Sequence, residues 1–216
     1  MTNVKVDRKG ILSAQEIDDM LEKTNALKPE YFRLRAKAIV GLFKTGKRRA
    51  EVAGLEQTDL RVEGGFLYIT FTVVKKRKKE TLVTRRTKRF RLTDRFAQCI
   101  VEYWSFMQQN CPKCKYLFPS VRSVFGEALA ISQSRHLSGR QILRIIKQLN
   151  PNAWCHLFRE TRGAEVVRAD EKRLGEASLI TVYRVKHALD LKREATAWNY
   201  INRYATETIE TEKEES

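Results

Sequence analysis

The chain has 216 residues, of which 42 are Lys or Arg and 26 are Asp or Glu, so its formal net charge is +16. Hydrophobic residues make up 42%, which is enough for a packed core and argues against a disordered chain. A folded chain this basic is expected to bind a polyanion, because each Lys or Arg placed on a phosphate releases condensed counterions.

Several classes of protein are excluded at once. The longest apolar stretches, such as residues 38–43, are far shorter than the roughly 20 residues that a membrane span requires. The N-terminal sequence MTNVKVDRKG has no apolar segment of the kind found in a signal peptide. Four Cys do not make a disulfide scaffold and fit a reducing compartment. We therefore expect a cytoplasmic protein that binds nucleic acid and has no membrane partner.

The first third of the chain predicts helices. Ser13 and Glu16 have the spacing of a capping box, which predicts a helix start after a flexible arm over residues 1–11. A second helix is predicted over 29–44, and Gly46, just after its end, is suited to a left-handed C-cap. The buried stripe expected on this helix consists of Leu34, Ala38, Ile39, Leu42 and Phe43. A short third helix should carry Arg48, Glu51, Val52 and Leu55.

The rest of the chain predicts one hairpin and then more helices. Residues 66–74 (FLYITFTVV) have strand composition, and residues 82–92 predict a returning strand after a long basic turn. Helices are expected from Asp94, from near Ser138 and over most of 154–205, with a loop at 110–120. Residues 206–216 hold five Glu and one Lys and predict a disordered acidic tail. The fold class is therefore mainly α with a small antiparallel β-sheet, in one domain over residues 12–205.

Motifs for nucleotide-dependent or metal-dependent chemistry are absent from the sequence. It has no GxxxxGK[ST], GxGxxG, HExxH or GxSxG, and its carboxylates are scattered. The pair Cys111 and Cys114 has half the spacing of a zinc ribbon, but no second pair follows, and Cys99, Cys155 and His136 are the remaining loose candidates. Two ordinary thiols are favoured over a zinc site, so no metal and no cofactor are expected.

The segment over residues 75–91 (KKRKKETLVTRRTKRFR) holds ten Lys or Arg and one Glu. On a hairpin it would project as a basic finger able to follow a DNA backbone, whereas the alternative is a solvated charge run. The DNA-binding residues predicted in it are Lys76, Arg77, Lys78, Lys79, Arg85, Arg86, Lys88 and Arg89.

Two short motifs combine groups that suit a phosphate. His156 and Arg159 are three residues apart on a predicted helix and share a face, so a proton carrier lies beside a planar cation. Arg48 opens another predicted helix, and Glu51 three positions on is available to brace it. Either pair could also be ordinary surface charge.

Taken together, these residues resemble the tyrosine recombinases (phage-type integrases). The run TGKRRAE at 45–51, followed by Leu55 and Asp59, is similar to the family's first-arginine box, with Lys47 where an apolar residue is usual. HLFRET at 156–161 resembles the His-x-x-Arg box, with Glu160 where His is frequent. LFPS at 117–120, VKH at 185–187 and TAWNY at 196–200 resemble further family elements in the family's order.

The resemblance implies a site-specific recombinase that joins a tyrosine to a 3′ DNA phosphate and releases a 5′ hydroxyl, without ATP or metal. It implies that Arg48 and Arg159 hold the phosphate oxygens, that His156 relays a proton and that His187 donates to the phosphate. A hairpin lysine would protonate the leaving oxygen: strand alternation favours Lys75, then Lys76, then Lys88. Tyr200 is predicted as the nucleophile. Tyr204 is an alternative because it shares one helical face with Tyr200, and Tyr183 is a second alternative.

The resemblance covers residues 12–205 and also implies double-stranded DNA as substrate, assembly to a tetramer on DNA and a role in a mobile element. The mobile element that the resemblance implies is a virus or plasmid, and the Lys- and Glu-rich composition favours a thermophilic, archaeal source. The N-terminal core-binding domain of most such proteins has no counterpart here, so either a fragment or a compact variant is expected. The rival functions are a type IB topoisomerase-like enzyme and a non-catalytic, integrase-derived DNA-binding regulator.

Overall fold

The computed structural model describes residues 10–76, 81–123 and 129–205. Near the ends of the hairpins, at residues 73–76, 81–82, 122–123 and 129, the backbone alone is described. The predicted arm at 1–9, the predicted tail at 206–216 and the DNA-binding candidates Arg77, Lys78 and Lys79 lie outside the described residues.

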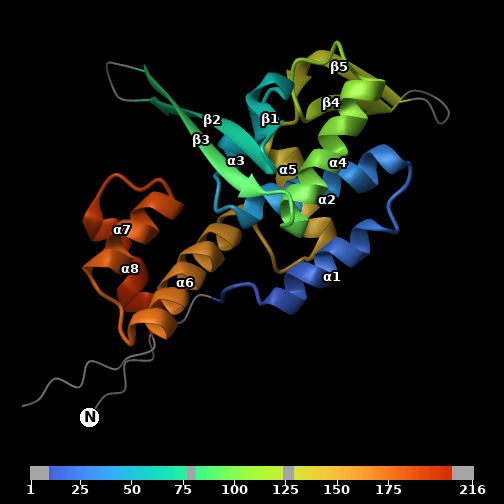
Figure 1. The fold of residues 1–216 in the computed structure, drawn as a ribbon. Coiled ribbons are helices and arrows are strands. Elements are labelled where there is room, and N and C mark those ends of the chain that lie inside the picture. The colour runs from blue at the N-terminus through green and yellow to red at the C-terminus, as the bar shows by residue number, and fades with distance from the viewer. Residues whose placement is uncertain (1–9, 77–80, 124–128, 206–216) are drawn as a thin grey trace, which may run out of the picture. The chain divides into compact units, whose positions relative to one another are not determined.

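The elements follow the predicted order, with α-helices in the majority (Figure 1). The helices are α1 (Ala14–Thr24), α2 (Glu30–Lys44), α3 (Arg49–Ala53), α4 (Arg95–Asn110), α5 (Gly139–Leu149), α6 (Cys155–Leu174), α7 (Leu179–Ala188) and α8 (Glu194–Tyr204), with a 3-10 turn η1 (Gln57–Asp59). The strands are β1 (Leu60–Glu63), β2 (Phe66–Lys76), β3 (Thr81–Arg91), β4 (Pro119–Ser123) and β5 (Leu129–His136).

The predicted fold class, mainly α with a small antiparallel sheet, is confirmed. Three strands were not anticipated: β1 is a four-residue segment, β4 begins inside the loop predicted at 110–120, and no element was predicted over the residues of β5. The sheets are β1-β2-β3, fully antiparallel, and the separate pair β4-β5. Across the described residues, no helix is long and apolar enough to cross a membrane.

The chain forms two compact units, and the single domain over residues 12–205 stays a prediction. The N-terminal unit is Leu12–Arg159. The C-terminal unit contains residues 160–205 together with residues 10 and 11, so the division falls inside α6. The two units have separate apolar clusters.

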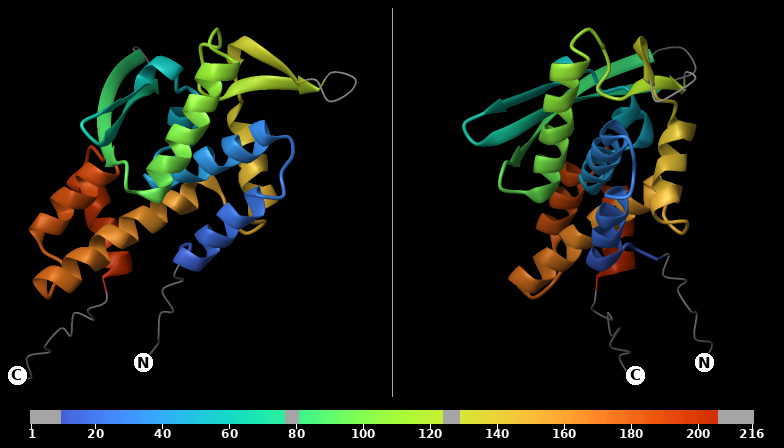
Figure 2. Two further views of the ribbon diagram at one scale, coloured as in Figure 1. Left: turned by 45° about the vertical axis from the view of Figure 1, so that its right-hand side comes forward. Right: turned by 90° about the vertical axis from the view of Figure 1, so that its right-hand side faces the viewer.

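Helix α2 is the centre of the N-terminal unit. The predicted stripe is buried, and Ala36, Val40 and Gly41 are buried too, so α2 is enclosed on most of its circumference. Helix α4 packs against it (Figure 1), and Gly41 permits the close approach because a Cβ there would lie 2.8 Å from the Phe96 carbonyl oxygen. The hairpin β2–β3 extends away from these helices in Figure 1, and Figure 2 shows the same elements from two further sides.

The C-terminal unit is built from α6 after Arg159, α7 and α8. Its apolar cluster joins Val167 of α6, Val182 and Val185 of α7, and Ala197 and Ile201 of α8. Asp170 on α6 is buried and accepts a hydrogen bond from Arg184 on α7, which links these two helices by charge as well as by packing.

We expect Gly41→Ala to lower the free energy of unfolding by about 1–2 kcal/mol, because the added methyl group overpacks the contact between α2 and α4. Urea denaturation followed by circular dichroism measures the effect. Gly10→Ala is the control, because a Cβ there meets no atom within 4 Å. Equal midpoints for the two variants would contradict the close packing.

Candidate functional site

One cavity of about 410 Å³ in the N-terminal unit brings the two predicted arginine motifs together. Arg48, His156 and Arg159 all line it, although more than a hundred residues separate the first from the other two. Within the described part of the chain, the lining residues are Lys47, Arg48, Arg49, Ala50, Leu143, Trp154, Cys155, His156 and Arg159. No acidic residue is among these described residues, so the cavity is suited to an anion.

Arg48 is positioned by the turn that ends α2. Gly46 adopts a left-handed φ of 78°, as the predicted C-cap requires, and Arg48 then becomes the N-cap of α3. Glu51 is buried and accepts two hydrogen bonds from Arg48, one from the backbone N–H at 2.9 Å and one from the guanidinium at 3.0 Å. The predicted brace between Arg48 and Glu51 is confirmed, and it leaves the Arg48 side chain 45% exposed.

Arg159 is held by the same turn. Its residue is 3% exposed, and its guanidinium donates to the Gly46 carbonyl oxygen at 2.7 Å. The first turn of α6 is fixed by Leu157 and Phe158 in the core, where the Phe158 ring lies 5.8 Å from that of Phe43. His156 is therefore left on the exposed side of α6.

Lys75 occupies a position on β2 that pairs with Leu82 of β3. The pairing runs from Phe66–Arg91 to Lys76–Thr81 without a bulge, so the alternation on which Lys75 was chosen is not interrupted. The assignment of Lys75 over Lys76 and Lys88 stays a prediction.

The basic residues of β3 divide between the two faces of the hairpin. Arg86 and Lys88 pair with Phe71 and Ile69, whose side chains are buried, whereas Arg85 and Arg89 lie on the exposed face. The Arg89 guanidinium lies 5.1 Å from the centroid of the Phe66 ring. These four predicted DNA-binding residues of β3 therefore lie on two faces of the hairpin.

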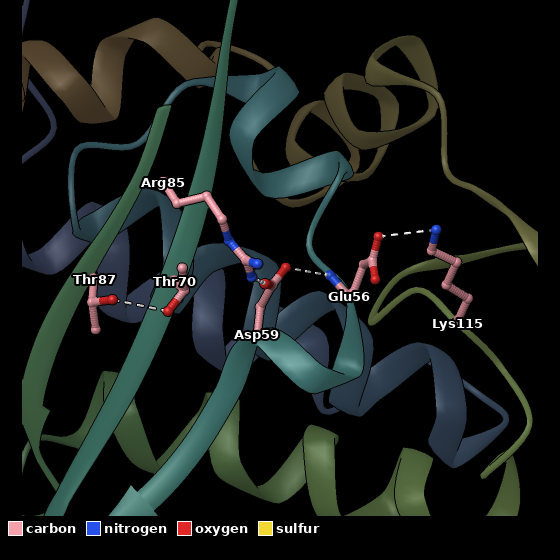
Figure 3. A network of polar contacts seen from close by, with 6 residues as sticks. All are labelled: Glu56, Asp59, Thr70, Arg85, Thr87 and Lys115. Carbon is pink, nitrogen blue, oxygen red and sulfur yellow. Dashed lines mark hydrogen bonds and ion pairs between the residues drawn. The ribbon is translucent and has the colours of Figure 1, made fainter. Parts of the chain in front are cut away.

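Arg85 also ties the hairpin to the body of the unit (Figure 3). Its guanidinium donates to Asp59 at 2.6 Å, and the second oxygen of Asp59 accepts from the Glu56 N–H at 3.0 Å. Glu56 in turn pairs with Lys115 at 3.2 Å, and Thr70 and Thr87 join β2 and β3 by a hydroxyl contact of 2.9 Å. Asp59, the last residue of the first-arginine box, therefore orients the strand pair that carries the predicted lysine.

The two remaining candidates belong to the C-terminal unit. His187 is exposed near the end of α7, and Tyr200 is buried on α8. The Tyr200 ring packs directly on α6 at Gly163, where a Cβ would lie 2.3 Å from a ring carbon. Glycine at position 163 is therefore required for α8 to dock in this position.

The two alternative tyrosines have different surroundings. The Tyr204 hydroxyl donates to Glu160 at 2.9 Å, and Arg203 donates to the same carboxylate oxygen at 3.2 Å. Burial, followed by the neighbouring Glu160, raises the pKa of Tyr204 to about 12. Tyr183 is 54% exposed on α7. Periodicity could not separate Tyr200 from Tyr204, and the structure adds that the Tyr204 hydroxyl is bound to Glu160.

Six of the nine lining residues were not predicted as site residues, and three of these, Lys47, Arg49 and Trp154, are cationic or aromatic. Lys47 and Arg49 flank Arg48 in the same box, so a search around the motif would have found them. Trp154 is 41% exposed, which is unusual for so large an apolar side chain, and it precedes His156 by two residues.

Cys111 and Cys114 close a tight turn after α4, in which the Cys114 N–H donates to the Cys111 carbonyl oxygen at 3.0 Å. Both are free thiols, and burial raises the pKa of Cys114 to about 11. Within the described parts of the chain, no three His, Cys, Asp or Glu side chains gather as a metal site.

Comparison with protein families matches residues 11–169 to the phage integrase family. The chain belongs to this family. The match spans both arginine boxes and the hairpin, so the resemblance drawn from the motifs is confirmed. No curated protein is significantly similar to this integrase-family chain in sequence.

Solved structures agree with the family. The chain superposes on XerH site-specific recombinase bound to difH substrate in a pre-cleavage complex, with a TM-score of 0.61 and 16% identity over 88% of this chain and 49% of XerH. For the post-cleavage complex of XerH with palindromic difH, the TM-score is 0.62 and the identity is 17%, over 91% of this chain and 50% of XerH. For the Tn1549 transposon integrase in complex with transposon right end DNA, the TM-score is 0.58 and the identity is 13%, over 96% of this chain and 65% of the integrase chain. The fold is that of tyrosine-recombinase catalytic domains, and this chain spans about half the length of XerH.

The contact between Tyr204 and Glu160 makes stability depend on pH in the alkaline range. Because the folded-state pKa of about 12 lies above the ordinary value of 10, this contact stabilises fully below pH 10 and is lost as the pH rises towards 12. Tyr204→Phe should lower the free energy of unfolding by about 1–2 kcal/mol at pH 8, and the difference from wild type should shrink by pH 11.5.

Urea denaturation at the two pH values measures this difference. Burial raises the pKa of Tyr31 and Tyr103 as well, but both residues are present in both proteins and cancel in the comparison. A difference that does not change with pH would show that the Tyr204 hydroxyl is not held by Glu160 as described.

Proposed function

We propose that this chain cleaves and rejoins DNA strands through a 3′-phosphotyrosyl intermediate, as a site-specific recombinase or integrase. The observation that carries the proposal is the single cavity lined by Arg48, His156 and Arg159. Family membership and the DNA complexes of the similar XerH and Tn1549 structures support it.

The cavity supports phosphoryl transfer by its charge and its rigidity. In such reactions catalysis consists mainly of holding the phosphate and neutralising the charge that develops on its oxygens. Arg48 and Arg159 are fixed by Glu51 and by the Gly46 carbonyl, so little reorganisation is needed when a phosphate enters. Planar guanidinium groups also match two phosphate oxygens at once.

In the proposed reaction the Tyr200 oxygen attacks the phosphorus atom, and its proton passes to His156. The bond to the 5′ oxygen breaks, and Lys75 supplies the proton that this oxygen takes up. His187 donates a hydrogen bond to the phosphate. Attack by the released 5′ hydroxyl on the phosphotyrosyl bond reverses these steps, so the energy of the bond is conserved and the strand is rejoined.

Tyr200 is favoured as the nucleophile over the two alternatives. Deprotonation is the first requirement of a tyrosine nucleophile, and the Tyr204 hydroxyl, with its pKa near 12 and its bond to Glu160, is badly placed for it. Tyr183 lies outside the TAWNY element that resembles the family's tyrosine motif.

The proposed partners are double-stranded DNA and further copies of the chain, assembled as a tetramer on the recombination site. The basic strand β3 supports the DNA contact through Arg85, Arg86, Lys88 and Arg89. We propose that a virus, plasmid or other mobile element encodes the protein, and that the protein acts on DNA in the cytoplasm.

The test is incubation with supercoiled plasmid in EDTA without ATP, followed by denaturation in detergent and detection of protein attached covalently to DNA. Wild type should give the adduct, and Tyr200→Phe should abolish it while DNA affinity stays within about twofold. Tyr204→Phe and Tyr183→Phe are matched controls that should retain at least a tenth of the wild-type adduct.

An adduct that persists in Tyr200→Phe would contradict Tyr200 as the nucleophile. DNA binding by wild type with no adduct, also when the chain is extended at its N-terminus, would contradict the enzyme and favour the DNA-binding regulator.

A further inference from the structure

The described lining of the arginine cavity has an apolar part as well as a cationic one. Ala50 of α3, Leu143 of α5 and Trp154, which lies in the turn between α5 and α6, line it together with the cations. The volume of about 410 Å³ is in the range of pockets that hold a small organic molecule, and a phosphate group alone is far smaller. The cavity therefore has room for part of the molecule to which a phosphate is attached.

The cationic and apolar parts meet along α5. The Arg49 side chain crosses the first residue of this helix, Gly139, where a Cβ would lie 2.6 Å from the Arg49 Nε. Leu143 is four residues further on and therefore lies on the same face of α5. The apolar wall thus begins one helical turn, about 5 Å, beyond the Arg49 side chain.

Trp154 is exposed although the backbone on both sides of it is fixed. Its neighbours Ala153 and Cys155 are buried, and its carbonyl oxygen accepts the Leu157 N–H at 2.9 Å in the first turn of α6. The side chain nevertheless stays 41% exposed, and within the described residues it belongs to neither apolar cluster. The indole is thus held at the cavity by its backbone and contributes little to the core.

An exposed indole beside a phosphate site favours a ligand that carries an apolar group next to its phosphate. Apolar surface left in water forfeits the free energy that burial would give, and a bound ligand that covers the ring recovers it. In DNA the groups bonded to each phosphate are deoxyriboses, whose C–H faces are apolar, whereas the bases of a duplex are stacked on one another. A sugar is therefore the first apolar group that a phosphate held by the arginines would bring to the indole.

We infer that Trp154 is a specificity-determining residue of this cavity, whose indole packs on the deoxyribose that carries the bound phosphate. The inference rests on the proposed function, because that phosphate would be the scissile one. It adds a contact that selects a sugar phosphate over a free inorganic anion.

The test compares Trp154→Ala and Trp154→Phe with Trp198→Ala. Trp198 is the matched control, because it is 40% exposed on α8 and is not among the described lining residues. The ligands are inorganic phosphate, thymidine 5′-monophosphate, and the 3′- and 5′-phosphates of methyl 2-deoxyribofuranoside, which carry a methoxy group in place of a base. Each is added at constant ionic strength in mildly alkaline buffer, where all are dianions, and the rise in melting temperature gives its affinity.

We expect wild type to bind the tighter of the two sugar phosphates about tenfold more strongly than inorganic phosphate. Trp154→Ala should lose this preference while its affinity for inorganic phosphate stays within about twofold of wild type. Trp154→Phe should keep most of the preference, since a phenyl ring offers a similar apolar face, and Trp198→Ala should match wild type. Thymidine 5′-monophosphate should bind within about twofold of the sugar 5′-phosphate, because the base adds no contact.

Four results would overturn the inference. The first is a preference for the sugar phosphate that persists in Trp154→Ala, and the second is an equal loss of affinity for both ligands, which would make Trp154 a structural residue. The third is much tighter binding of thymidine 5′-monophosphate that depends on Trp154, since the contact would then be with the base. The fourth is wild type that binds none of the ligands. If wild type shows the expected preference but forms no adduct on plasmid, the proposed function fails and the role of Trp154 stands.

Discussion

The hydrogen bond from the Arg159 guanidinium to the Gly46 carbonyl is the contact on which the site depends. It joins two segments 113 residues apart and brings the second arginine to the turn that presents the first. The turn can accept this bond because Gly46 is left-handed, which directs the chain out of α2 and into α3. Glu51 then balances part of the charge of Arg48, so that two guanidinium groups can share one cavity before any phosphate is bound.

Two further carboxylates of the arginine boxes each hold an element of their own unit. Asp59 holds Arg85 and thereby the hairpin, and Glu160, directly after Arg159, holds Tyr204 and Arg203 of the tyrosine helix. Asp59 therefore orients the hairpin that carries the proposed Lys75, and Glu160 orients the helix that carries the proposed Tyr200. In the proposed reaction, cations fixed in this way would stabilise the negative charge of the transition state more than that of the bound substrate.

Local features were predictable from the sequence, and long-range ones were not. The capping box of Ser13 and Glu16, the stripe of α2 and the left-handed Gly46 follow from neighbours within one or two turns, and the structure has them all. Strands β4 and β5 were not predicted, because their sequences PSVRS and LAISQSRH lack the strict alternation of apolar and polar residues that marks a half-buried strand. The contact of Tyr204 with Glu160 and the burial of Lys47 against Phe71 have no local signal, since tertiary packing alone creates them. The resemblance to a family predicted that the two arginine motifs act at one site, which periodicity could not predict.

The central claim is that Arg48 and Arg159 act by neutralising the negative charge of the scissile phosphate. The most direct measurement is the rate of covalent adduct formation by Arg159→Ala on a DNA substrate whose scissile phosphate is replaced by an uncharged methylphosphonate. If the guanidinium acts through charge, the loss of about a hundredfold or more expected on ordinary DNA should shrink to less than about tenfold on the neutral substrate. An equal loss on both substrates would contradict the account, because Arg159 would then serve to build the cavity and not to balance charge.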